Sequence, residues 1–190
     1  MRIWNNVRSA VLMMLATAIL FGLVYPLLVT GAAQALFPDE ANGQLIVRGG
    51  VRVGSALIGQ PFSAERYFHG RPSAAGAGYD ASASGGSNLG PTSKALMDRV
   101  GRDVAALQAE NPGVPIPADL ATASASGLDP HISPAGARFQ VARVARARGR
   151  TTAEIAQAVD AAIEGRQFGF LGEPVVNVLL LNLELDRRWP

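Results

Sequence analysis

The side chains best suited to catalysis lie close together near the middle of the chain. The stretch SASGLDPHIS, residues 124–133, places Asp129 and His131 beside several serines, a composition that suggests a Ser-His-Asp hydrolase. Known triads are assembled from separate elements, and their serine lies on a strained turn, often in a G-x-S-x-G motif that this chain lacks. We therefore expect Asp129 and His131 to hydrogen-bond within their loop and to cap a helix starting at Pro134.

A second candidate site is the glycine- and serine-rich stretch YDASASGGSNLGPTS, residues 79–93. Its centre could present backbone N–H groups to an anion, which makes it a weak candidate for a nucleotide site. The candidate residues are Ser84, Gly85, Gly86 and Ser87. The G-x-x-x-x-G-K-[ST] motif is absent, and Lys94, the only lysine, lies outside the stretch. The alternative is an ordered loop in which Asn88 and Gly90 serve the fold or contact a partner.

Other chemistries have little support in the composition. The chain has no cysteine, so disulfides, thiolate metal sites and lipidated cysteines are excluded. Its two histidines, His69 and His131, do not form an HExxH motif, and we expect no metal centre. Beyond residue 38 acidic and basic residues balance, so we expect no nucleic-acid binding. The arginines between Arg138 and Arg148 are expected mainly on a solvated helix face, with pairing to a partner's acids as the alternative.

An uncharged segment near the N-terminus must position the rest of the chain. Residues 9–38 carry no charge, and AVLMMLATAILFGLVYPLLVTGAA is long enough to cross a bilayer. This length favours an uncleaved anchor over a signal peptide, although Ala33-Gln34-Ala35 resembles a cleavage site. We expect a transmembrane helix over 10–32, kinked at Pro26 or accommodated there by a partner's packing.

The charges that flank this segment predict its orientation. Arg2 and Arg8 precede it, whereas Asp39 and Glu40 follow it. The positive-inside rule then places residues 1–9 in the cytoplasm and residues 38–190 on the periplasmic or other extracytoplasmic side of a bacterial inner membrane. Small residues on the helix offer a surface to a partner helix. These residues are Gly22 and Gly31, with Thr30 beside them.

The remaining sequence predicts a compact mixed α+β (or α/β) domain with long polar loops. Strands are expected at 44–48 and 51–59, and a helix from Thr92 or Ser93 to about Glu110. Further helices are expected from Ser133 to Gly149 and from Thr151 to Gly165, the second with a capping box. Residues 175–186 fit either a helix or a strand, and we favour a helix.

Several long stretches together resemble the C subunit of the Kdp potassium-transporting ATPase. They are YFHGRPSAAGAGYDASASGGSNLGPTS, VPIPADLATASASGLDPHISP, FQVARVARARG and VNVLLLNLELD. The resemblance covers nearly the whole chain and is weakest at residues 39–60 and in the final RRWP.

This resemblance implies a non-catalytic accessory subunit of an ATP-driven potassium importer. Its partners would be a channel-like A subunit, a P-type ATPase B subunit, a small F subunit and membrane lipid, with ATP and potassium handled by the complex. The family is also described as a catalytic chaperone that raises the ATP affinity of the B subunit. The predicted orientation puts Ser84–Ser87 across the membrane from cytosolic ATP, so any such effect would pass through subunit contacts. The alternative function is a membrane-anchored extracytoplasmic hydrolase using Asp129, His131 and a nearby serine.

Overall fold

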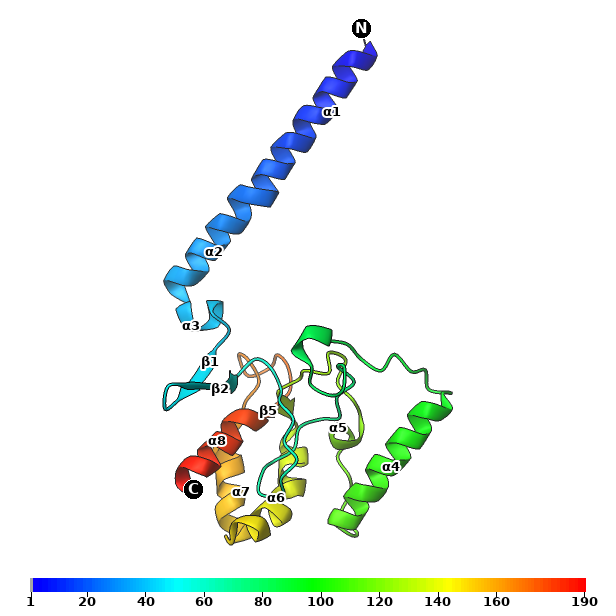
Figure 1. Ribbon diagram of the computed structural model, residues 1–190, viewed down its shortest axis with the longest axis vertical. Coiled ribbons are helices and arrows are strands. Elements are labelled where there is room, and N and C mark those ends of the chain that lie inside the picture. Colours follow the sequence, from blue (N-terminus) through cyan, green and yellow to red (C-terminus); the bar gives the residue numbers. More distant parts are fainter. Residues whose placement is uncertain (1) are drawn as a thin grey trace. The chain divides into compact units, whose positions relative to one another are not determined.

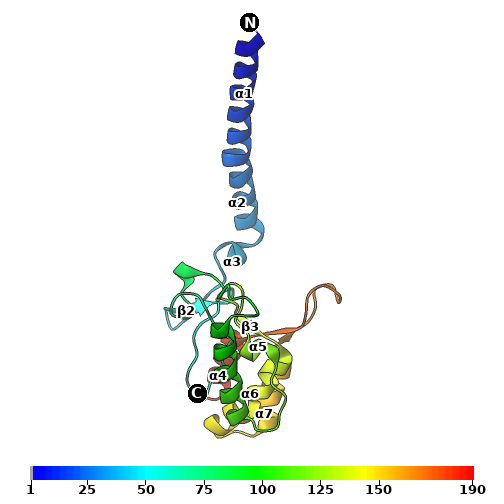
Figure 2. The same ribbon diagram turned by 90° about the vertical axis from the view of Figure 1, so that its right-hand side faces the viewer.

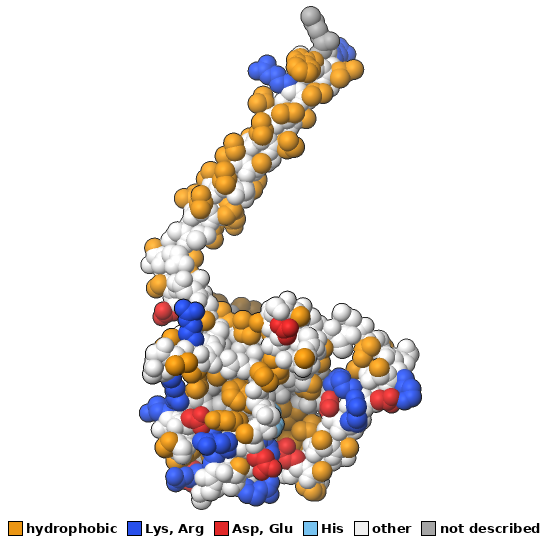
Figure 3. All heavy atoms as spheres, viewed as in Figure 1, with side chains coloured by type: hydrophobic (Ala, Val, Ile, Leu, Met, Phe, Trp, Pro, Cys, Tyr) orange, Lys and Arg blue, Asp and Glu red, His pale blue; other side chains and the backbone are white. Residues whose placement is uncertain are grey.

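The computed structural model describes residues 2–190 and divides them into two compact units, one ending at Leu45 and one running from Ile46 to Pro190. The first unit is dominated by one long helix, built from α1 (Arg2–Ile19), η1 (Leu20–Val24) and α2 (Tyr25–Leu36). None of its side chains is buried, and apolar side chains line it along its length (Figure 3). At 1.5 Å per residue its 35 residues extend about 50 Å, more than the roughly 30 Å of a bilayer's hydrocarbon core.

The proline in this helix is accommodated by a local change of helix type. Pro26 lacks an N–H, and its ring would clash with the carbonyl of Gly22 in a regular α-helix. The turn before it, η1, is a π-helix, and the N–H of Tyr25 bonds the carbonyl of Leu20. Widening one turn separates the ring from the carbonyl that it would otherwise strike. The surfaces at Gly22 and Gly31 are open, with no atom within 4 Å of a Cβ built at either position.

A short helix, α3 (Pro38–Ala41), ends the first unit, and a β-hairpin follows. The hairpin pairs β1 (Leu45–Arg48) with β2 (Val51–Ser55). Gly49 and Gly50 connect the strands with φ of +56° and +80°, the left-handed values that a two-residue turn requires. The first predicted strand is confirmed, whereas the second ends four residues earlier than expected because residues 56–58 form a turn.

The second unit places helices around a small antiparallel sheet (Figure 1). Its sheet has the order β3-β5-β4, so β5 pairs with both neighbours. The strands are β3 (His131–Ile132), β4 (Ile163–Glu164) and β5 (Val175–Asn177). The helices are η2 (Ala81–Ala83), α4 (Lys94–Glu110), α5 (Ala118–Ala121), α6 (Pro134–Arg148), α7 (Thr152–Ala161) and α8 (Val178–Arg188).

Local capping explains where α6 and α7 begin and end. The Ser133 hydroxyl accepts a bond from the N–H of Gly136 at 2.9 Å, and Gly149 ends α6 with a φ of +61°. Thr151 and Glu154 form the predicted capping box of α7. That helix ends at Ala161, earlier than the predicted residue 165, because the next residues pair as β4 with β5.

The C-terminal segment combines the two interpretations that its sequence allowed. Val175–Asn177 is the central strand of the sheet, and the Asn177 side chain then accepts a bond from the N–H of Leu180 and so caps α8. On this helix Leu181 and Leu185 are buried, whereas Leu183 is only half-buried. The alternating leucines therefore reflect helical spacing, and the preference for a helix is confirmed for Val178–Arg188.

The hydrophobic core lies between α6, α7, α8 and the sheet. Its largest fully buried side chains include Phe68, Ile132, Ile155, Leu181 and Leu185. Helix α4 forms as predicted, but it contributes no buried residue, and it contacts α5. Its apolar stripe is only half-buried, so α4 lies at the surface of the unit.

Candidate functional site

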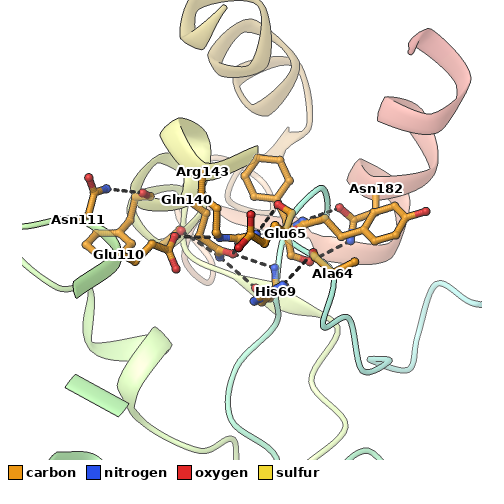
Figure 4. A network of polar contacts seen from close by, with 12 residues as sticks. Ala64, Glu65, His69, Glu110, Asn111, Gln140, Arg143 and Asn182 are labelled. Atoms are coloured by element: carbon orange, nitrogen blue, oxygen red, sulfur yellow. Dashed lines mark hydrogen bonds and ion pairs between the residues drawn. The ribbon is translucent and has the colours of Figure 1, made fainter. Parts of the chain in front are cut away.

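A segment outside the helices and strands, residues 62–72, crosses the unit between α6 and α8 and contains the YFHGRP motif. Two buried side-chain amides hold it by its backbone (Figure 4). Asn182 accepts from the N–H of Phe68 at 2.8 Å and donates to the carbonyl of the same residue at 2.9 Å. Gln140 does the same for His69, at 2.8 and 3.0 Å. The two amides thus satisfy backbone groups that a neighbouring strand would satisfy in a sheet.

The guanidinium of Arg143 extends this network to α4 (Figure 4). It donates to the carbonyls of Glu65 and Tyr67 at 2.6 and 2.9 Å and to the Gln140 amide oxygen at 2.7 Å. Its Nε donates to Glu110 at 3.0 Å, which ties the end of α4 to α6. A buried charge with this many partners fixes the relative position of three segments.

A second arginine network holds the same part of the segment. Arg148 donates to Asp186 at 2.8 Å and to the carbonyl of Arg66 at 2.7 Å, and the Tyr67 hydroxyl also donates to Asp186 at 3.0 Å. The pKa of Asp186 is lowered: burial opposes this, but the bonds from Arg148 and Tyr67 outweigh it.

The prediction that the arginines of α6 lie on a solvated face is therefore wrong for two of them. Arg138 and Arg146 are exposed as expected, but the side chains of Arg143 and Arg148 are only 7% and 2% exposed. Helical spacing alone does not show that a face with cations on it packs against carbonyl groups. One signal was present in the sequence: Gln140 and Asn182 interrupt the apolar faces of their helices, and buried amides at such positions require polar partners.

A cleft of about 440 Å³ lies beside this network, between α4 and residues 69–73. Burial, and secondly the charge of Arg143, lowers the pKa of His69, and its Nε2 lies 3.1 Å from the carbonyl oxygen of Ala64. The cleft's acids are both engaged, Asp103 with Arg99 at 2.8 Å and Glu110 with Arg143. The Glu110–Arg143 pair joins α4 to α6 beside the cleft, whereas the Asp103–Arg99 pair lies within α4.

The glycine- and serine-rich loop is ordered against residues 124–129. The Ser73 hydroxyl donates to the carbonyl of Gly127 at 2.6 Å and accepts from the N–H of Tyr79 at 2.8 Å. The Tyr79 hydroxyl donates to the carbonyl of Arg71 at 2.6 Å, and burial raises the pKa of this tyrosine to about 12. A Cβ added to Gly127 would lie 2.6 Å from the Cβ of Ala75, so only glycine fits this crossing.

The candidate residues for a nucleotide site lie against the same stretch, residues 124–129. The Ser84 hydroxyl and the Gly85 N–H both donate to the carbonyl of Ser126, at 3.0 and 2.9 Å. Gly86 packs against the backbone of Ala125. The Gly85 N–H is thus engaged within the domain, and the nest interpretation of Ser84–Ser87 stays a prediction. Asn88 lies exposed just beyond, in the left-handed region with φ of +51°, and the exposed Gly90 accepts from the N–H of Ser93 at 2.9 Å.

Asp129 and His131 occupy the neighbouring loop. Asp129 accepts from Arg71 at 3.0 Å and from the backbone N–H of His131 at 3.0 Å, so it orders its own loop as predicted. Its oxygen lies 3.7 Å from Nδ1 of His131, too long for the hydrogen bond of a triad. The predicted capping role was wrong, because Ser133 caps α6 and Asp119 accepts from both the N–H and the hydroxyl of Ser133.

Within residues 2–190 no three histidine, aspartate or glutamate side chains converge to hold a metal ion. The chemistry-bearing residues described above instead orient loops and helices. The arrangement is suited to presenting a rigid surface, and the loops at 79–93 and 124–131 lie on that surface.

Comparison with known proteins gives a consistent result over nearly the full length. The family described as "KdpC: K+-transporting ATPase, c chain" matches residues 7–187. A "Potassium-transporting ATPase KdpC subunit" of Koribacter versatilis is 61% identical over 186 residues, covering 98% of this chain and 96% of the relative. Proteins of the same name from Caulobacter vibrioides and Myxococcus xanthus are 58% and 62% identical, covering 98% and 91% of this chain and 95% and 83% of the relatives.

Proposed function

Because the chain belongs to the KdpC family of potassium-transporting ATPase subunits, we propose that it acts as a non-catalytic accessory subunit, anchored by its N-terminal helix. The observation that carries the proposal is the helix Arg2–Leu36, which is apolar, longer than a bilayer core and without a buried side chain. Such a helix needs lipid or partner helices around it. Gly22 and Gly31 offer the open surfaces at which a partner helix could approach closely.

The second part of the proposal is the orientation. Arg2 and Arg8 lie at one end of the helix, and Asp39 and Glu40 follow the other end. Residues 1–9 are then cytoplasmic, 10–32 span the inner membrane, and 38–190 form the periplasmic domain. Alkaline phosphatase fused after Pro190 should be active, since this enzyme folds only outside the cytoplasm, whereas a fusion at the N-terminus should be inactive. The reverse pattern would refute the orientation.

The third part concerns the partners, which we propose are the channel-like A subunit, the P-type ATPase B subunit and the small F subunit. ATP hydrolysis then belongs to the B subunit, and any effect of this chain on ATP affinity passes through subunit contacts. This is supported by the Gly85 N–H and the Ser84 hydroxyl, whose bonds to Ser126 hold them within the domain. In the purified complex, an azido-ATP label should mark the B subunit and leave this chain unlabelled. Labelling at residues 84–87 would contradict the proposal.

Asn88 offers a sharp test of whether the loop contacts a partner. Its φ of +51° is one that glycine adopts freely, so Asn88→Gly removes the side chain without straining the backbone. If the side chain contacts the A subunit, co-purification of the complex should fall while the thermal stability of the free chain stays unchanged. Unchanged co-purification would show that the side chain makes no contact that assembly needs.

A further inference from the structure

The loop that connects β4 with β5 carries exposed apolar side chains at its tip. The two most exposed large apolar side chains described between Ile46 and Pro190 are Phe168 and Phe170, at 87% and 69% exposure. Leu171 beside them is 47% exposed. Figure 2 shows this orange segment extending away from the rest of the unit. The other phenylalanines of the unit, Phe62, Phe68 and Phe139, lie in the core or pack against it.

This segment is built as a rigid projection. Its base is the pairing of β4 with β5, in which Val176 is fully buried. Above the base, Arg166 and Glu173 form an ion pair at 2.6 Å. At the tip the N–H of Gln167 bonds the carbonyl of Leu171 and the reverse bond is also made, both at 2.9 Å. Because these bonds are internal, little conformational entropy remains to be lost when the tip is buried by a partner.

The backbone at the tip is also strained at the residue whose side chain is most exposed. Phe168 has φ of +53°, a left-handed conformation that is rare for a bulky residue. The two hydrogen bonds between Gln167 and Leu171 hold this conformation, and the Phe168 ring is left in solvent. A strained residue that gains no packing within its own chain fits a role in contact with another molecule.

We propose that the tip formed by Phe168, Phe170 and Leu171 is a docking anchor that inserts into an apolar pocket of another protein subunit of the potassium-transporting complex. This inference rests on the proposed function, since it takes the partner from that complex. Aromatic residues, phenylalanine among them, are enriched at protein–protein interfaces, and the tip presents two of them on a rigid support.

The charge around the tip argues against an anionic lipid surface as the occupant. The charged residues around the tip are Glu164, Arg166 and Glu173, which together carry a net charge of −1. Segments that bind anionic bilayers carry an excess of lysine and arginine, and this one does not. The Glu173 side chain is 77% exposed although it pairs with Arg166, so it remains available to a cation at the rim of a protein pocket.

The test compares variants of the full chain expressed with the partner subunits. Phe168→Asn keeps a residue that tolerates the left-handed conformation while removing the apolar ring, and Phe170→Ser removes the second ring. Together they should lower the retention of this chain in the detergent-solubilised complex by about tenfold or more, in the range expected for loss of a hot spot. Val114→Ser, an exposed apolar position on another loop, is the control and should retain full assembly.

A photo-crosslinking phenylalanine analogue at position 168 identifies the occupant. Adducts to a partner subunit support the proposal, whereas adducts only to lipid, or to a second copy of this chain, overturn it. Full assembly of the double variant also overturns it and leaves the proposed function intact. If the unaltered chain fails to co-purify with the potassium-transporting subunits, the proposed function itself fails.

Discussion

Replacing Asn182 tests the idea that side-chain amides hold the YFHGRP segment in place. Asn182 is 1% exposed and makes both of its backbone bonds to Phe68. Asn182→Leu keeps the approximate volume but leaves the N–H and the carbonyl of Phe68 without partners. Each unsatisfied buried group costs about 1–3 kcal/mol, so the variant should lose about 4 kcal/mol of the free energy of unfolding. For a chain of this size that corresponds to a fall in Tm of roughly 10 °C.

Asn182→Asp gives a matched variant whose loss of stability depends on pH, as that of Asn182→Leu does not. The introduced carboxylate can accept from the N–H of Phe68, but it faces the carbonyl of Phe68 with a second acceptor. Burial raises the pKa of the introduced group, and protonation restores a donor to that carbonyl. A raised folded-state pKa contributes stability at low pH that is lost as pH rises. The difference in stability from the unaltered chain should therefore shrink as pH falls, whereas for Asn182→Leu it should stay constant.

The measurement is thermal unfolding by circular dichroism in detergent, with hydrogen exchange at the Phe68 amide. That amide should exchange faster in Asn182→Leu than in the unaltered chain. A loss in the free energy of unfolding below about 1 kcal/mol, the net value of a single ordinary hydrogen bond, would refute the idea that Asn182 holds the YFHGRP segment in place. The segment would then owe its position to the packing of the Phe68 ring and to its bonds with Gln140, Arg143 and Arg148.

Two further predictions concern a loop crossing and a histidine. Gly127→Ala should lower the free energy of unfolding by about 3 kcal/mol or more, because the φ of +67° adds backbone strain and the added Cβ would lie 2.6 Å from Ala75. The control Gly113→Ala, with φ of +79° in open space, should cost only about 1–2 kcal/mol. Chemical denaturation of the two variants measures the difference. Because the pKa of His69 is lowered in the folded chain, the unfolded chain binds a proton there more readily, and stability should fall as pH drops below 6.5. His69→Gln should flatten this dependence in melting curves recorded at a series of pH values. An unchanged slope would show that His69 is not the group responsible.

The local elements of the second unit were predictable because their signals are local. Ser133 before Pro134, the Thr151–Glu154 box and Gly149 set helix ends through bonds that span only a few residues. The strand β4 was not predictable in the same way, since Ile163 continues the apolar spacing of α7. Its pairing with Val176, thirteen residues further along the chain, ends the helix and is not encoded in the local pattern.

The candidate site shows the same division. Asp129 orders its loop as the sequence predicts, but the partner that balances its charge, Arg71, lies 58 residues away. The role of Asp119 at the start of α6 was missed for the same reason, since it reaches Ser133 from α5. The roles of Ser84–Ser87, Asn88 and Gly90 toward a partner stay predictions for the experiments proposed above.

By itself, the sequence determined the properties that arise from composition and short spacing. These are the apolar N-terminal helix, the charges that flank it, the helix caps and the membership of the KdpC family. Tertiary structure decided which polar residues are buried and which apolar residues are not. Arg143 and Asn182 enter the interior because residues 65–68 offer backbone groups there, whereas Phe168 is held in solvent by the bonds beneath it. Such outcomes depend on contacts between residues far apart in the chain, which local sequence patterns do not encode.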